Sequence, residues 1–154
     1  MTKGRLVFLG HYLKFKDKIY SYFWYRTGMR RELAEDLTSD VFLKAWQKFE
    51  TFDQSRSFQA WVYRIAHNHL VDHYRLRRLE IDIDELHDLG AEDRRSWEVW
   101  QLLEKLPDDD KEVISLKYLQ GFSYKEIAEM LSKTEEAVRV MAHRALKKLQ
   151  ATIL

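Results

Sequence analysis

Two segments decide the fold: AEDLTSDVFLKAW at residues 34–46 and FQAWVYRIAHNHLVDHYR at residues 58–75. In the first, apolar side chains recur at every fourth position from Leu37 to Ala45, which is the spacing of one helix face. In the second, apolar side chains form a continuous stripe of the same periodicity. Both segments therefore predict amphipathic helices that pack against a common core.

The second segment also carries a face that a core does not need. This face combines cationic, amide and apolar side chains, at Arg64, Asn68, Val71, Arg75 and Arg78. Such a mixture is unusual on a merely solvated helix and suits a long partner that is rich in hydrogen-bond acceptors, such as a nucleic acid.

The composition is that of a folded protein without cysteine chemistry. The chain has 154 residues, of which 45% are hydrophobic and none is cysteine. Disulfides, thiolate zinc sites and a cysteine nucleophile are therefore excluded. The sequence contains no apolar run of membrane-spanning length, and its N-terminus lacks the apolar core of a signal peptide. We expect a soluble, cytoplasmic protein.

The charge is distributed unevenly along the chain. Residues 1–78 carry 15 Lys and Arg against 8 Asp and Glu, whereas residues 79–93 carry 7 acidic residues and no basic one. Segments of opposite charge indicate separate partners. We predict an all-α protein of two small helical domains, residues 1–78 and 96–154, joined by an acidic linker at 79–95. Residues 79–93 of this linker are expected to be mobile in the free protein.

The remainder of the chain is also predicted to be helical. Apolar spacing favours a helix over residues 6–27, which Gly28 ends. Ser123 and Glu126 have the spacing of a capping box, and Thr134 is placed to cap a last helix. Two short helices that meet at a turn before a longer basic helix predict a helix-turn-helix.

These segments resemble regions 2 and 4 of the sigma-70 family, in its extracytoplasmic-function (ECF) branch. The resemblance rests on AEDL at 34–37, VFLKAW at 41–46, WVYRIAHN at 61–68 with Asp72, and YKEIA at 124–128. It covers roughly residues 8–150. It implies a dissociable sigma factor that binds core RNA polymerase, recognises the −10 and −35 elements of promoters and helps open the duplex, with no active site and no cofactor of its own.

The resemblance also implies residue roles. Core polymerase is expected to meet one exposed helix face, at Asp36, Asp40, Leu43 and Lys44. The −10 element is expected to meet a loop and the helix after it, through Phe52, Ser55, Arg56, Arg64, Asn68, Val71, Asp72 and Arg75. The −35 element is expected to meet the last helix, through Thr134, Glu136, Arg139, Val140, His143, Arg144 and Lys147. The implied partners are core RNA polymerase, promoter DNA and an anti-sigma protein.

Two other functions remain open at this point. A DNA-binding regulator could use the helix-turn-helix alone, with the first domain as a sensor, but a sensor has no need of the motifs at 34–46 and 61–68. A helical metal-dependent hydrolase could be built on His69 and His73, which have the spacing of two ligands on one helix face. The sequence offers no third ligand beside them, so no metal site is expected.

Overall fold

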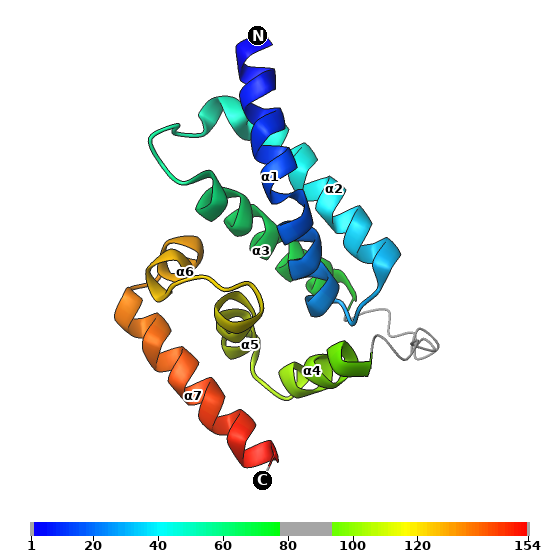
Figure 1. Cartoon of the computed structure of the whole chain (residues 1–154), viewed down its shortest axis with the longest axis vertical. Coiled ribbons are helices and arrows are strands. Elements are labelled where there is room, and N and C mark those ends of the chain that lie inside the picture. The colour runs from blue at the N-terminus through cyan, green and yellow to red at the C-terminus, as the bar shows by residue number, and fades with distance from the viewer. Residues whose placement is uncertain (1, 78–93, 154) are drawn as a thin grey trace.

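The computed structural model describes residues 2–77 and 94–153, and within these ranges all regular structure is helical (Figure 1). The elements are α1 (Thr2–Arg26), α2 (Arg31–Lys48), the 3₁₀ turn η1 (Phe49–Thr51), α3 (Phe58–Arg77), α4 (Arg94–Glu104), α5 (Asp108–Ile114), the π-helical turn η4 (Ser115–Leu119), α6 (Tyr124–Leu131) and α7 (Glu135–Ile153). The first helix begins at Thr2, earlier than predicted. None of the helices in the described ranges is both long and apolar enough to cross a membrane.

Helices α1, α2 and α3 form the first bundle. The predicted inner row of α2 is buried, with Leu37, Val41 and Ala45 at most 3% exposed. Trp46 lies at the edge of this row and remains 41% exposed, although its ring packs 5.1 Å from that of Phe8. The periodicity therefore locates the buried face of α2 correctly except at its border.

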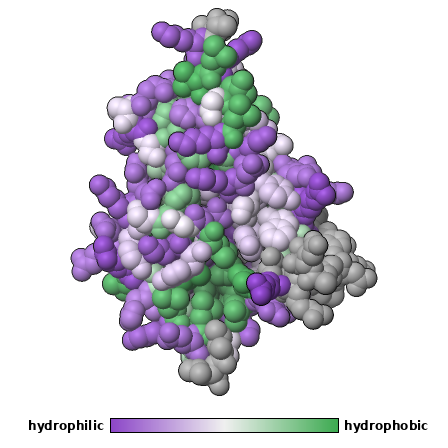
Figure 2. All heavy atoms as spheres, in the orientation of Figure 1, coloured by the Kyte–Doolittle hydropathy of each residue, from purple (hydrophilic) through white to green (hydrophobic). Residues whose placement is uncertain are grey.

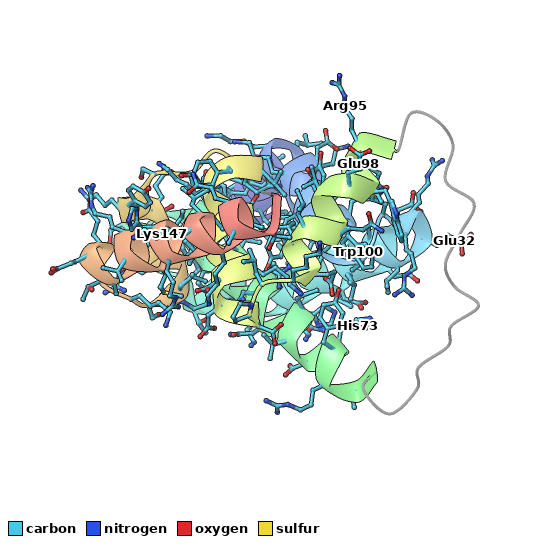
Figure 3. The ribbon with its side chains drawn as sticks, turned by 90° about the horizontal axis from the view of Figure 1, so that it is seen from below. Glu32, His73, Arg95, Glu98, Trp100 and Lys147 are labelled. Atoms are coloured by element: carbon cyan, nitrogen blue, oxygen red, sulfur yellow. The ribbon has the colours of Figure 1, made fainter. Side chains whose placement is uncertain are left out.

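A left-handed turn connects α1 to α2. Gly28 and Met29 have φ angles of 72° and 61°, and the Met29 amide donates to the carbonyl of Trp24 over 2.8 Å. A Cβ added at Gly28 would lie 3.3 Å from the ring of Trp100 in α4, which is labelled in Figure 3. Gly28 thus permits the left-handed backbone of the turn and also leaves room for Trp100 of α4 to pack closely.

Helices α5, α6 and α7 form the predicted helix-turn-helix. Ser123 and Glu126 make the reciprocal bonds of a capping box, and the Ala137 amide donates to the Thr134 hydroxyl over 3.1 Å, so both predicted caps are confirmed. Between the two helices Ser132 adopts a left-handed conformation with φ of 55°. The turn closes although a serine occupies the position that favours glycine.

The two halves of the chain pack against each other. One hydrophobic core contains Ile19 and Val62 of the first half together with Leu116 and Ile127 of the second. Helix α6 lies on α3, and η4 lies on α1. Helix α4 already begins at Arg94, and the linker predicted before it falls outside the described residues except at its end. Figure 2 shows the polar surface of this assembly, with apolar patches near the N-terminal end of α1 and over the second half.

Candidate nucleic-acid and polymerase interface

Helix α3 presents the predicted −10 residues on one face. The Ser57 hydroxyl accepts from the Ala60 amide over 3.2 Å and so caps the helix at its start. Val62, Ala66 and Leu70 are buried against the bundle. The structure then brings a set of exposed side chains together on the opposite side, namely Arg64, Asn68, Val71, Asp72 and Arg75.

The loop before α3 is held by local bonds. The Asp53 carboxylate accepts from the amide and hydroxyl of Ser55 over 2.9 and 2.7 Å, and these bonds lower its pKa. Ser55 and Arg56 are exposed, as a DNA contact requires. Phe52 is not, because it is 8% exposed and packs with its ring centre 4.8 Å from that of Trp61. In this arrangement Phe52 anchors the loop and offers no ring face to a base.

Helix α2 exposes the predicted polymerase-binding face. Asp36 and Asp40 are exposed, and Leu43 is 57% exposed. Lys44 is half-buried, and its Nζ lies 2.8 Å from Nδ1 of His69 on α3. Nε2 of the same imidazole lies 3.2 Å from the Asp40 carboxylate. Asp40 and Lys44 therefore also connect α2 to α3.

These contacts also bear on the metal hypothesis. Both ring nitrogens of His69 face side chains of α2 and not His73. Among the described residues, no group of three or more His, Cys, Asp or Glu side chains is arranged to hold a metal ion. The geometry thus gives the hydrolase hypothesis no support.

Helix α7 carries the predicted −35 residues. Val138, Ala142 and Ala145 are buried. The other side of the helix and the residue that caps it expose the whole predicted set, Thr134, Glu136, Arg139, Val140, His143, Arg144 and Lys147, of which Lys147 is labelled in Figure 3.

Two of the α7 arginines are held in place. Arg139 donates to Glu135 over 2.7 Å, and its guanidinium lies 5.0 Å from the ring centre of Tyr124. Arg144 donates to Asp110 of α5 over 2.6 Å. Both side chains are therefore oriented by contacts within the chain.

One polar cluster was not predicted from the sequence. Glu112 of α5 is 2% exposed and contacts Tyr22, Arg26 and His67 of the first half. Burial opposes ionisation of this carboxyl group, but the charge of Arg26, the nearby His67 and the hydrogen bond from Tyr22 lower its pKa to about 2. The available sequence signal was weak: Glu112 lies four residues before Leu116 and therefore on the apolar face of its helix.

Comparisons with known proteins agree with this geometry. The family model Sigma-70 region 2 matches residues 11–80, and Sigma-70, region 4 matches residues 96–149. The chain is 32% identical over 151 residues to the ECF RNA polymerase sigma factor BldN of Streptomyces coelicolor, in a match that covers 90% of this chain but 57% of BldN. It is 30% identical over 157 residues to the ECF RNA polymerase sigma factor SigW of Bacillus subtilis, in a match that covers 88% of this chain and 83% of SigW.

The fold agrees as well. A solved structure of CnrH in complex with the cytosolic domain of CnrY matches with a TM-score of 0.79 and 28% identity, covering 97% of this chain and 88% of that one. The match to region 2 falls on helices α1 to α3, and the match to region 4 falls on helices α4 to α7. The chain belongs to the sigma-70 family of RNA polymerase sigma factors, in its ECF branch.

Proposed function

We propose that this chain binds core RNA polymerase and directs it to a subset of promoters, with the α3 face and its preceding loop at the −10 element and α7 at the −35 element. One observation carries the proposal. The two exposed helix faces, on α3 and α7, lie within the residues matched by the models of Sigma-70 region 2 and Sigma-70, region 4.

At the −10 element, the roles follow from side-chain chemistry. Arg64 and Arg75 supply positive charge for phosphates, and the Asn68 amide offers a donor and an acceptor to a base edge. The loop around Ser55 and Arg56 supplies polar groups for an extruded base, whose unstacking costs a few kcal/mol that contacts must offset. Phe52 anchors this loop to α3 by packing on Trp61.

At the −35 element, α7 is the recognition helix. Its N-terminal half, with Glu136, Arg139 and Val140, reaches base edges in the major groove. Its basic C-terminal half, with His143 and Lys147, holds phosphates. Arg144 belongs to the same face, but it also ties α7 to α5 through Asp110.

The polymerase-binding surface is the exposed face of α2. Asp36, Asp40 and the exposed Leu43 combine charge with an apolar anchor, a composition that suits a helical partner with basic and apolar positions. The polymerase forms the phosphodiester bonds, so we assign no catalytic residues to this chain. We expect the chain to act in the cytoplasm, where the polymerase is. An anti-sigma protein is the proposed regulatory partner, and the CnrH structure contains a second protein, CnrY.

In vitro transcription with core polymerase on genomic fragments tests the proposal. We expect transcripts from defined start sites only when chain and core are both present. Charge reversal by Asp36→Lys with Asp40→Lys should abolish core binding and leave helicity unchanged, whereas Glu32→Lys, at an exposed position of the same helix labelled in Figure 3, should not. If the chain instead binds promoter DNA tightly without core polymerase, and core polymerase never co-purifies with the chain, the chain is a DNA-binding regulator and not a sigma factor.

A further inference from the structure

A buried carboxylate joins the two halves of the chain. Oε1 of Glu112 accepts a hydrogen bond from the Tyr22 hydroxyl over 2.6 Å and lies 3.3 Å from Nδ1 of His67, while Oε2 pairs with Arg26. Tyr22 and Arg26 lie on α1 and His67 lies on α3. All three partners therefore belong to the other half, and the carboxylate meets them only when the halves pack in this register.

The same packing covers part of α3. Arg64 Nη2 donates to the Glu129 carbonyl of α6 over 2.9 Å, and Gln59 donates to the Glu126 carboxylate over 3.0 Å. Tyr63 of α3 also packs against the segment that precedes α6. Arg64, which we assign to the −10 element, is thus already bonded to the second half.

A cavity of about 470 Å³ lies next to this contact. Its α3 side includes Val71 and Arg75, and its opposite side includes Glu104, Asp108 and Asp109 together with Lys111, whose Nζ lies 3.0 Å from the Glu104 carboxylate. The face that we assign to the −10 element therefore looks onto three acidic side chains. In this arrangement the second half of the chain faces the side chains that we assign to the −10 element.

We propose that the cluster of Glu112 with Tyr22, Arg26 and His67 is a latch that holds most of the free chain in a closed form, and that this closed form does not bind the −10 element. The proposal rests on the assignment of α3 to that element. A buried ion pair gains little net free energy over its hydrated, separated partners. The latch therefore determines how the two halves fit together when they close, and closing remains reversible. A partner that binds one half more tightly when the halves are apart opens it.

The two states can be told apart without DNA. Because the chain has no cysteine, Lys18→Cys and Lys125→Cys allow specific labelling with a donor and an acceptor dye. Both positions are exposed, on α1 and α6. Three residues after Lys18, the Ser21 hydroxyl of α1 accepts from the Gln120 side chain over 3.4 Å, next to the segment that leads into α6. Energy transfer should be high in the parent chain.

Loss of either charge of the latch should open the chain. Glu112→Gln and Arg26→Gln should each lower energy transfer, and the double variant should lower it no further, because one pair is being removed. Glu98→Gln, which removes an exposed carboxylate of α4 labelled in Figure 3, is the matched control and should change nothing. If both latch variants retain the parent's energy transfer with native helicity, the latch does not exist.

Opening should also expose the −10 face. A closed population of about nine in ten weakens DNA binding about tenfold. Glu112→Gln should therefore bind a pre-melted −10 oligonucleotide up to about tenfold more tightly than the Glu98→Gln control. Equal affinity of the two variants, with energy transfer lowered in Glu112→Gln, would show that the closed form does not block DNA.

A covalent lock avoids any effect of the latch variants on folding. In the chain that carries both Lys18→Cys and Lys125→Cys, a short bismaleimide can join the two introduced thiols. The linked chain should not bind the oligonucleotide, whereas chains carrying the reagent on one thiol should bind it as tightly as the parent chain does. Full binding by the linked chain would overturn the proposal. If no chain binds the oligonucleotide, linked or not and with or without core polymerase, the proposed −10 function is wrong. The latch is then still tested by energy transfer, because that measurement uses no DNA.

Discussion

Arg144 of α7 donates to the carboxylate of Asp110 in α5 over 2.6 Å, and Lys148 donates to the other oxygen over 3.0 Å. Asp110 itself is completely buried. One residue that we assign to DNA is thus also part of the contact that sets the orientation of the recognition helix.

This double role predicts a stability difference between neighbours. Asp110→Ala should lower the free energy of unfolding by on the order of 1–3 kcal/mol, because a buried, charge-assisted set of hydrogen bonds is lost. Arg144→Ala should lower both stability and DNA binding, whereas His143→Ala should lower DNA binding alone. Urea unfolding followed by circular dichroism separates the three variants. Equal stability of Arg144→Ala and His143→Ala would show that the bond to Asp110 is of no consequence.

The turn between α1 and α2 gives a second prediction. Gly28→Ala should destabilise the chain for two reasons, a left-handed backbone that costs an alanine about 1–2 kcal/mol and a Cβ only 3.3 Å from Trp100. Gly121→Ala is the matched control, because its φ is 79° and no atom lies within 4 Å of the added Cβ. Thermal unfolding should show the larger loss for Gly28→Ala, accompanied by a change in tryptophan fluorescence. Identical losses would mean that the contact with Trp100 adds nothing.

The helices and their caps could be predicted from the sequence because their causes are local. Apolar spacing located the buried face of α2, and the Ser123 and Thr134 caps depend on residues three positions away. The Glu112 cluster could not be predicted, since its hydrogen bonds join residues 86 and 90 positions apart. The resemblance assigned Phe52 to the −10 element, and its burial against Trp61 could not be predicted because it depends on how α3 packs.

Acid should weaken the contact between the halves. The pKa of Glu112 is lowered from its ordinary 4.5 to about 2, so the ionised form is favoured in the closed chain. The resulting stabilisation is fully present above pH 4.5 and is lost as pH falls toward 2. Energy transfer between labels at Lys18→Cys and Lys125→Cys should follow this loss, and Glu112→Gln should remove that part of the pH dependence. If the parent chain and Glu112→Gln lose energy transfer over the same acid range, Glu112 is not the group responsible.

Arg139 should read sequence at the −35 element. Its guanidinium lies over Tyr124 and is held by Glu135, which orients it from the N-terminal half of α7. Arg139→Ala should cost about 1–3 kcal/mol at defined base pairs and relax the preference there. Lys147→Ala is the comparison, because loss of a phosphate contact weakens all sequences alike and reduces the salt dependence. Binding to a library of −35 variants measures both, and a uniform loss for Arg139→Ala would make it a phosphate anchor.

Asn68 should act in promoter opening. It lies on the exposed face of α3, between Arg64 and Val71 and away from the buried row that includes Ala66. A neutral amide in this position can pair with a base edge, and extrusion of a base costs a few kcal/mol that such contacts must offset. Asn68→Ala should therefore leave helicity and polymerase binding unchanged but impair melting of a duplex promoter. A pre-melted promoter should recover only part of the activity, because the base contact is still missing. Permanganate footprinting measures the melting directly, and a normal footprint with the alanine variant would exclude Asn68 from opening.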